Sequence, residues 1–213
     1  MQKFTALMQN PVFRKRMIVF GIAKKTVMAA VLAFSMDASA AQAGDYVVDY
    51  KKSKVEFSGT HAGNAFTGQF GTWTAVITFD PAQLDTSKIV ATFDTNTAKT
   101  GNSMYDGTLP QADWFDVKNH AQATFTSTAI TAKDDAGNYT AVGDLTIRGI
   151  TKPATFDFTL SDLAQSPVTA KGSLTLDRME YDIGKKSDAS AEWVSRDIVI
   201  ALDITATPAP AAE

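Results

Sequence analysis

The side chains that could carry out chemistry are few and scattered in this sequence. The chain has no cysteine and only two histidines, His61 and His120, each in a predicted loop. Without cysteine there is no thiol nucleophile, and the two histidines lack the spacing of a metal site. No G-x-S-x-G motif, P-loop or G-x-G-x-x-G sequence is present. We therefore predict no catalytic residue, no metal and no resident cofactor, and we expect a binding protein rather than an enzyme.

One short segment combines a strand pattern with a basic turn. Residues 143–153 read GDLTIRGITKP, in which apolar and polar residues alternate before the turn residues crowd together. We predict a hairpin link in which Gly149 takes a positive φ angle and Pro153 is the first residue of the next strand. Arg148 and Lys152 would then lie at one rim, where two cations could hold an anionic headgroup. The alternative is a hairpin with a structural role alone.

The charge of the chain argues against a polyanionic partner. Residues 1–43 hold six of the 20 basic and one of the 23 acidic residues, so the rest has 14 basic and 22 acidic residues and a net charge of −8. Such a surface repels phosphate backbones, and we expect no nucleic-acid partner. The composition, 45% apolar and 20% charged, is that of one ordinary globular domain.

Residues 1–43 are predicted to be a cleavable signal peptide for export. Two lysines precede the apolar run Val27–Met36, and small residues with two A-x-A sites follow. We expect cleavage after Ala43, and Met17 offers an alternative start that gives a shorter leader. The rival interpretation is a membrane anchor, but this run is too short to cross roughly 30 Å of hydrocarbon. We therefore expect no stable membrane insertion of the mature protein.

Eight segments alternate apolar and polar residues with a period of two, which is typical of strands that bury one face. The second of them changes phase near Gly71, and we predict a β-bulge at Gly71–Thr72. The segments are 46–58, 66–79, 88–94, 121–130, 139–148, 152–160, 168–177 and 194–205.

The links between these segments are mostly short, which indicates antiparallel neighbours. Eight antiparallel strands are best closed into a barrel, because closure removes the exposed edges; a two-sheet sandwich is the alternative. Two insertions interrupt the pattern, residues 95–120 and residues 179–193, and the first should contain one or two helical turns within 102–109. We place the folded domain at 44–207 and a frayed tail at 208–213.

Several stretches of the sequence resemble the YceI-like family. They are SKVEFSGTHAGNAFTGQFGTWTAVITFDP (53–81), DWFDVKNHAQATFTSTAI (113–130), GDLTIRGITKP (143–153) and the closing RMEYDIG, EWV and IVIALDI, and they follow one another in the right order along essentially the whole mature chain. The resemblance implies an exported protein of a Gram-negative-type periplasm with an eight-stranded, lipocalin-like antiparallel barrel. It also implies an interior that binds a polyisoprenoid or a similar long-chain amphiphile, including quinone-like lipids.

The resemblance carries over onto His61, the 145–152 hairpin and the pair Trp114–Phe115. The chain departs from the family in the segment MYDGTLPQADWF, where many members have an Arg-Asp pair followed by a leucine. Asp106 and Leu109 correspond to two of these residues, but Tyr105 stands at the arginine position, which puts the headgroup preference in doubt.

Large and small residues are mixed on the faces expected to point inward. An eight-stranded barrel has room either for packed side chains or for one slim ligand. Small residues (Ala91, Ala123, Ala141, Gly143, Ala170 and Gly172) leave volume for a ligand, although small residues that face large ones to fill the taper explain the same list. We predict a cavity, and the expected lipid contacts are His61, Phe66, Phe70, Trp114, Phe115, Phe125, Phe156 and Phe158, with Arg148 and Lys152 for the headgroup.

The leading expectation is a periplasmic binding or carrier protein for an isoprenoid or quinone-like lipid held inside the barrel. One alternative is a non-catalytic adaptor with a solid barrel, in which the 95–120 insertion binds a protein and His61 is a turn residue that packs on its neighbours. The other is a lipid-modifying enzyme, which the small number of bases and nucleophiles disfavours.

Overall fold

The computed structural model describes residues 44–161 and 163–210, and the predicted signal peptide with its cleavage site lies outside the described residues. In the described part, no helix has the length and apolar content to cross a membrane. The helical elements are short: η1 (Thr95–Thr97), α1 (Ser103–Thr108) and η2 (Arg178–Tyr181). The strands are β1 (Gly44–Val48), β2 (Lys54–His61), β3 (Asn64–Phe70), β4 (Trp73–Phe79), β5 (Lys88–Asp94), β6 (Ala98–Lys99), β7 (Gln122–Ala132), β8 (Asn138–Ile147), β9 (Ile150–Leu160), β10 (Val168–Asp177) and β11 (Asp197–Pro208).

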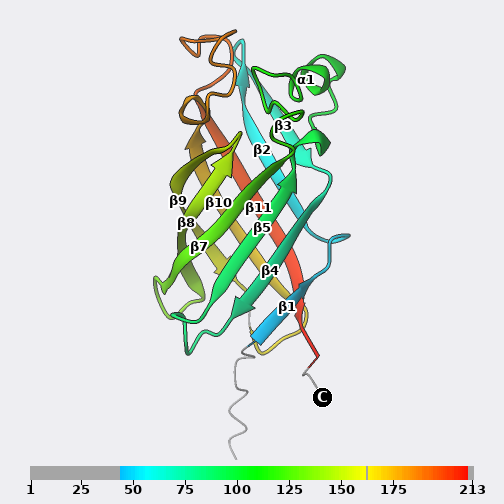
Figure 1. The fold of residues 1–213 in the computed structure, drawn as a ribbon. Helices are drawn as coiled ribbons and strands as arrows, with labels where there is room; N and C mark the ends of the chain where they lie inside the picture. The colour runs from blue at the N-terminus through cyan, green and yellow to red at the C-terminus, as the bar shows by residue number, and fades with distance from the viewer. Residues whose placement is uncertain (1–43, 162, 211–213) are drawn as a thin grey trace, which may run out of the picture. The chain divides into compact units, whose positions relative to one another are not determined.

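These strands close into an eight-stranded antiparallel barrel (Figure 1), which confirms the predicted fold class. The ring runs β1, β4, β5, β7, β8, β9, β10 and β11, and it closes because β11 pairs with β1. The predicted strand 46–58 is split into β1 and β2, and both halves pair with β11. In the same way β3 and β4 divide the predicted strand 66–79, and β6 continues β5 after η1.

The break between β3 and β4 falls at Gly71 and Thr72, where the apolar residues change phase in the sequence. The neighbouring strand forms η1 at this level. The carbonyl of Thr97 accepts a hydrogen bond from the Gly71 N–H at 3.1 Å, and the Thr97 hydroxyl accepts one from the Thr72 N–H at 2.9 Å. The irregularity therefore involves both strands, and it is larger than the one-residue bulge predicted from the sequence.

The β8–β9 hairpin has a two-residue turn, Arg148 and Gly149, with φ angles of 52° and 75°. Two successive positive φ angles match the right-handed twist of the flanking strands, and glycine takes the second without strain. The positive φ of Gly149 is thus confirmed. The prediction that Pro153 opens the following strand is wrong, because β9 begins at Ile150 and Pro153 pairs with Asp144 inside the ladder.

Both insertions lie at one end of the barrel, which we call the insertion end, and the described ends of the chain lie at the other, the terminal end (Figure 1). The expected helical turns are α1, which Asn102 caps by accepting hydrogen bonds from the N–H groups of Met104 and Tyr105. At the terminal end β11 runs to Pro208, and the Ala209 N–H donates to the Asp45 carbonyl at 2.7 Å, so the ordered chain passes the predicted domain boundary.

Some small residues of the strands lie directly against aromatic rings. A β-carbon at Gly143 would lie 2.7 Å from the ring of Phe125, and one at Gly172 would lie 2.9 Å from the β-carbon of Phe158. Ala141, fully buried, lies on the same face of β8 as Gly143. At these positions small residues face large ones and fill the interior, as the alternative interpretation of the sequence predicted, so they do not themselves create a cavity.

Gly143→Ala should therefore destabilise the barrel, because the added methyl must displace the Phe125 ring and the neighbouring backbone. We expect the free energy of unfolding, measured in urea, to fall by about 1–3 kcal/mol. Gly107→Ala in α1 is the matched control, since nothing lies within 4 Å of its β-carbon position. The control should be neutral or stabilising by up to about 1 kcal/mol, and equal losses in both variants would contradict the packing described.

Candidate functional site

An apolar cavity of ≈ 170 Å³ lies inside the barrel. It extends from Tyr46 and Phe79 at the terminal end to Phe93 and Ile147 toward the insertion end, and strands from all round the ring contribute to its wall. Apart from Lys171, the residues that line it carry no charged side chain. An engineered apolar cavity of similar size stays dry and accepts a small hydrocarbon, so the space suits an apolar guest.

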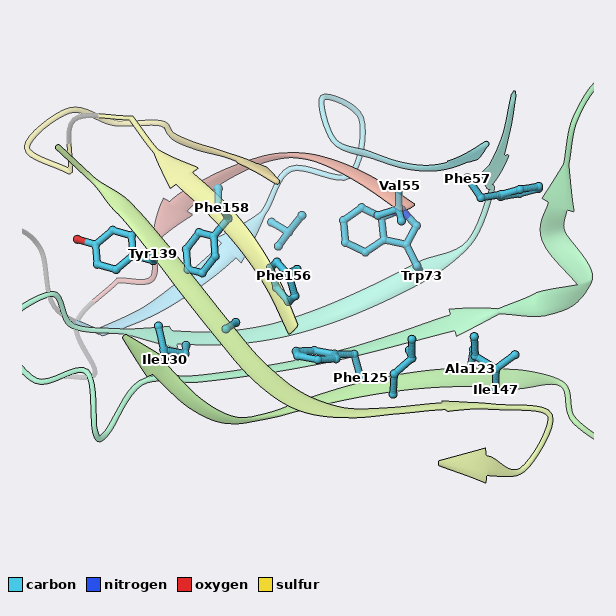
Figure 2. Packing of buried hydrophobic residues seen from close by; sticks show 14 of the residues in the cluster. Val55, Phe57, Trp73, Ala123, Phe125, Ile130, Tyr139, Ile147, Phe156 and Phe158 are labelled. Carbon is cyan, nitrogen blue, oxygen red and sulfur yellow. The ribbon is translucent and has the colours of Figure 1, made fainter. Parts of the chain in front are cut away.

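One wall of the cavity is aromatic. Phe125, Phe156 and Phe158 project into the barrel from β7 and β9, as Figure 2 shows. The ring centroids of Phe125 and Phe156 are 5.3 Å apart, and those of Phe156 and Phe158 are 5.7 Å apart. Such edge-to-face and tilted pairs fix the rings against one another, which gives this wall a defined surface.

The remaining wall combines alanines with branched aliphatic residues. Ala75 and Ala91 pair across β4 and β5, and Ala170 pairs with Ile204 across β10 and β11; all four line the cavity. Because alanine side chains do not reach the aromatic wall, the volume of the cavity follows from these positions. The predicted cavity is present. Its space lies next to the alanines, whereas the Phe125 ring occupies the space beside Gly143.

Packed aromatic rings occupy both ends of the barrel. At the terminal end, the rings of Phe79 and Tyr139 meet edge to face at 5.1 Å, and Tyr139 stacks on Phe158 at 5.5 Å. At the insertion end, Phe70 contacts Phe93 at 5.4 Å and further rings of β2 and the 95–120 insertion. Packed aromatic rings, buried or half-buried, therefore stand at both ends of the cavity along the barrel axis.

The insertion at 179–193 is organised round a buried ion pair that the sequence analysis did not single out. The Arg178 side chain is 1% exposed, and its Nη2 lies 2.7 Å from Asp188 Oδ2. The same guanidinium donates to the carbonyls of Ile183 and Val194 at 2.6 and 2.9 Å, and it lies 5.7 Å from the centre of the Trp114 ring. These donors and acceptors are satisfied within the chain, so Arg178 and Trp114 serve the structure of the insertion end.

Burial raises the pKa of Asp188, but the N–H groups of Val194 and Trp193 and the charge of Arg178 outweigh this effect, so that the pKa lies below its usual range. The carboxylate is thus held in its charged form. No cluster of three metal-ligating side chains occurs among residues 44–161 and 163–210.

His61 and Tyr105 join the β2–β3 hairpin to α1. The His61 Nδ1 lies 2.9 Å from the Tyr105 hydroxyl, and the two rings meet edge to face at 5.1 Å. Tyr105 also contacts Phe66 at 6.2 Å between ring centroids. The residue that departs from the family pattern thus contributes a hydroxyl and an aromatic ring to a side-chain cluster outside the cavity.

The structure separates the predicted lipid contacts into two groups. Four of them line the cavity: Phe70, Phe125, Phe156 and Phe158. The other four lie at the insertion end, outside the cavity lining: His61, Phe66, Trp114 and Phe115.

The two predicted headgroup residues differ in their surroundings. Arg148 donates to the carbonyl of Asp182 and, at 2.8 Å, to that of Ala112, so it ties the β8–β9 turn to both insertions. Its Nε is buried and has no hydrogen-bond partner in the described part of the chain. Lys152 is half-buried and belongs to the inward-facing set of β9 with Phe156. The pKa of Asp182 is lowered mainly by a hydrogen bond from Lys185, and the positive charges of Arg148 and Lys152 lower it further.

Much of the cavity wall comes from residues that the sequence analysis did not select as lipid contacts. The signal for them was present, because each has the inward parity of its strand, but the selection followed the family motifs and a few phenylalanines and passed over the other inward positions, most of them aliphatic. They include Trp73, Ile77, Ile89, Phe93, Leu174, Leu176, Ile200, Leu202 and Ile204.

Comparison with known proteins agrees with this geometry. Residues 46–206 match the family model of the YceI-like domain. The chain belongs to the YceI-like family. A UPF0312 protein of Vibrio parahaemolyticus is 30% identical over 169 residues, which are 75% of this chain and 89% of that protein.

Two solved structures extend the comparison of this YceI-like chain. The crystal structure of BcnA from Burkholderia cenocepacia has a TM-score of 0.71 and 30% identity, and the match covers 76% of this chain and all of that one. A polyisoprenoid binding domain from Saccharophagus degradans, implicated in plant cell wall breakdown, has a TM-score of 0.61 at 14% identity, with 79% of this chain and 100% of that chain covered. The second likeness shows the fold alone.

The lowered pKa of Asp188 gives a stability effect with a defined sign. A carboxylate whose folded pKa is depressed contributes stability that is fully present above its unfolded pKa, about 4, and is lost as the pH falls through the folded value. Asp188→Asn leaves Arg178 buried without its counter-charge, and we expect about 3 kcal/mol less stability at pH 7.

Urea unfolding at pH 7 and at pH 3 would measure this effect. The difference between the wild type and Asp188→Asn should narrow at the lower pH, because below about pH 4 the unfolded Asp188 takes up a proton and the wild type loses part of the stability that its charged carboxylate contributes. Asp135→Asn, at an exposed hairpin tip, is the control and should follow the wild type at both pH values. A constant difference would mean that the pair does not titrate in this range.

Proposed function

We propose that the protein binds a long-chain isoprenoid or quinone-like lipid inside the barrel and carries it through the periplasm. The observation that carries the proposal is the cavity, which extends between the aromatic ends of the barrel and is lined almost entirely by apolar side chains. A chain of hydrocarbon units is the guest that such a narrow apolar tube favours. The polyisoprenoid binding domain of Saccharophagus degradans has the same fold, which supports this choice of ligand class.

The expected affinity follows from apolar burial. Transfer from water contributes about 0.8 kcal/mol per buried CH₂, so a five-carbon isoprene unit contributes roughly 2–4 kcal/mol before the cost of ordering the chain. Phe125 and Phe156 would contact one side of the chain, and Ala91 and Ala170 would leave room for it on the other. The site residues thus act by shape and burial.

Lys152 is the better candidate of the two predicted headgroup residues. Its half-buried side chain belongs to the inward-facing set of β9, whereas the guanidinium of Arg148 already donates to two carbonyls. We propose that Lys152 attracts an anionic headgroup at the insertion end and that Arg148 holds the turn on which this end is built.

A second candidate function, an adaptor that binds a protein through the insertion end, has one observation in its favour. Met104 in α1 and Trp193 in the second insertion are 68% and 61% exposed. Exposed methionine and tryptophan side chains are enriched in protein interfaces. The adaptor requires no guest in the cavity, so lipid binding separates the two proposals.

Affinity for prenols of increasing length should rise with each isoprene unit and level off once the cavity is full. Ala91→Leu should shift this plateau to chains shorter by about one unit, because the added methylenes occupy the guest's space. Val76→Leu, on the outward face of β4, is the control and should leave the plateau unchanged. Titration of each variant with a prenol series, together with its melting temperature, measures both effects. Lower stability in Ala91→Leu with no change in chain preference would refute the lipid site and favour the adaptor.

Replacement of Lys152 tests the headgroup proposal. Lys152→Met should weaken binding of a polyprenyl phosphate by about tenfold at low salt, since a partly buried charge pair contributes about 1.5 kcal/mol. The neutral prenol should be little affected, and the difference should shrink at high salt. Arg148→Met should instead lower stability and weaken both ligands alike. Equal losses for both ligands in Lys152→Met would assign Lys152 a structural role.

A further inference from the structure

The ladder between β9 and β10 stops half-way along the barrel. The two strands pair from Leu160 with Ala170 to Asp157 with Ser173, and no further. Both strands continue toward the insertion end, β9 as residues 150–156 and β10 as residues 174–177. Along this part β9 pairs only with β8, and β10 pairs only with β11. We call the unpaired part of the wall between these two segments the slot.

Pro153 gives a chemical reason why the ladder does not resume at the far end of the slot, where the continued register would place it opposite Asp177. In a two-residue hairpin the flanking pair, here Ile147 and Ile150, is the hydrogen-bonded one, and the pairs alternate from there. The backbone groups of Thr151, Pro153 and Thr155 therefore point away from β8 and toward β10. Since proline has no N–H, a ladder cannot pass this position, and proline in a sheet is confined to such edges.

The slot has fixed ends. The last ladder pair, Asp157 with Ser173, bounds it on the side of the terminal end. On the other side Arg148 donates to the carbonyl of Asp182, which links the β8–β9 turn to the segment that follows β10. The buried pair of Arg178 and Asp188 holds that segment in place. The slot is thus an unpaired part of the barrel wall with a fixed boundary at each end.

The slot lies against the cavity on its inner side. Phe156 on one edge and Leu174 and Leu176 on the other all line the cavity. A polar groove on the outer surface begins at Asp157 and Ser173, and both this groove and the cavity reach Phe158 and Gly172. The wall next to the slot is therefore thin, with little more than a glycine backbone between the inside and the outside.

Other interruptions of the ladder are filled by side chains. Where β1 ends, the Tyr50 hydroxyl accepts a hydrogen bond from the Ala75 N–H at 3.1 Å, and its ring packs on Trp73 at 4.9 Å. Beside β11, the Ser53 hydroxyl bonds both backbone groups of Thr205. Between residues 150–156 and 174–177, all of which the structure describes, no backbone hydrogen bond replaces the missing ladder.

We propose that the slot is the entrance by which the lipid chain passes sideways into the cavity, an inference that rests on the proposed function. Passage along the barrel axis would require the buried rings at one end to unpack, which costs the burial of several aromatic side chains. Passage through the slot requires only that side chains at its edges move aside, because no backbone hydrogen bond has to break there.

Tying the edges of the slot together tests the proposal. Thr155 and Thr175 are exposed, and they would face each other if the register of the ladder continued. Thr155→Cys with Thr175→Cys, linked after folding by the shortest bis-maleimide that joins them, spans the slot, and the chain has no other cysteine. The matched control is Thr175→Cys with Val199→Cys, which links an intact ladder pair on the outer face of β10 and β11.

The probe is a ubiquinone with two isoprene units, whose quinone ring quenches the fluorescence of Trp73 in the cavity wall. We expect the link across the slot to slow uptake and release by about tenfold or more while the Kd stays unchanged, as for a closed gate, and the control link to change neither rate. Unchanged rates with normal affinity would overturn the slot alone and indicate passage through an end. Absence of binding to the unlinked protein would overturn the proposed function and the slot with it.

Discussion

The closure of the backbone ladder is the interaction on which the rest of this structure depends. Strand β11 closes the ring because it pairs with both β1 and β2, and the residues that connect β1 to β2 form a loop between these two pairings. Outside the slot between β9 and β10, a closed ring satisfies the backbone groups of its strands without help from a packed centre. The strands therefore stay paired whether or not side chains fill the interior, and the sizes of those side chains decide whether the barrel is packed or hollow.

The distribution of side-chain size follows from this freedom. Aromatic rings gather at both ends and along β7 and β9, where glycines on neighbouring strands receive them. Alanines occupy the facing positions of β4, β5 and β10, and there the interior stays open. Aromatic and small residues together thus produce packed rings in one layer of the barrel and a cavity in another.

The eight strands and their antiparallel order could be predicted because period-two alternation and short polar turns are local properties of the sequence. The strand 88–94 and the strand 168–177 have the predicted bounds. The role of Arg178 could not be predicted, since its partners are brought together only by the fold of the 179–193 insertion. Local pattern likewise could not show that Trp114 packs with Arg178, or that β9 leaves β10 after four pairs, because both depend on contacts between distant segments.

The apolar lining of the cavity has a consequence for the empty protein. A dry cavity forfeits dispersion contacts, at about 24 cal/mol per Å³, so the space of ≈ 170 Å³ represents on the order of 4 kcal/mol of stability that the unfilled barrel lacks. This is a large fraction of the stability of a domain of this size. A guest that fills the space restores these contacts, so the loaded protein opens less often than the empty one. Quality-control proteases, which cut the opened chain, would then remove empty molecules faster than loaded ones and couple the abundance of the protein to the supply of the guest.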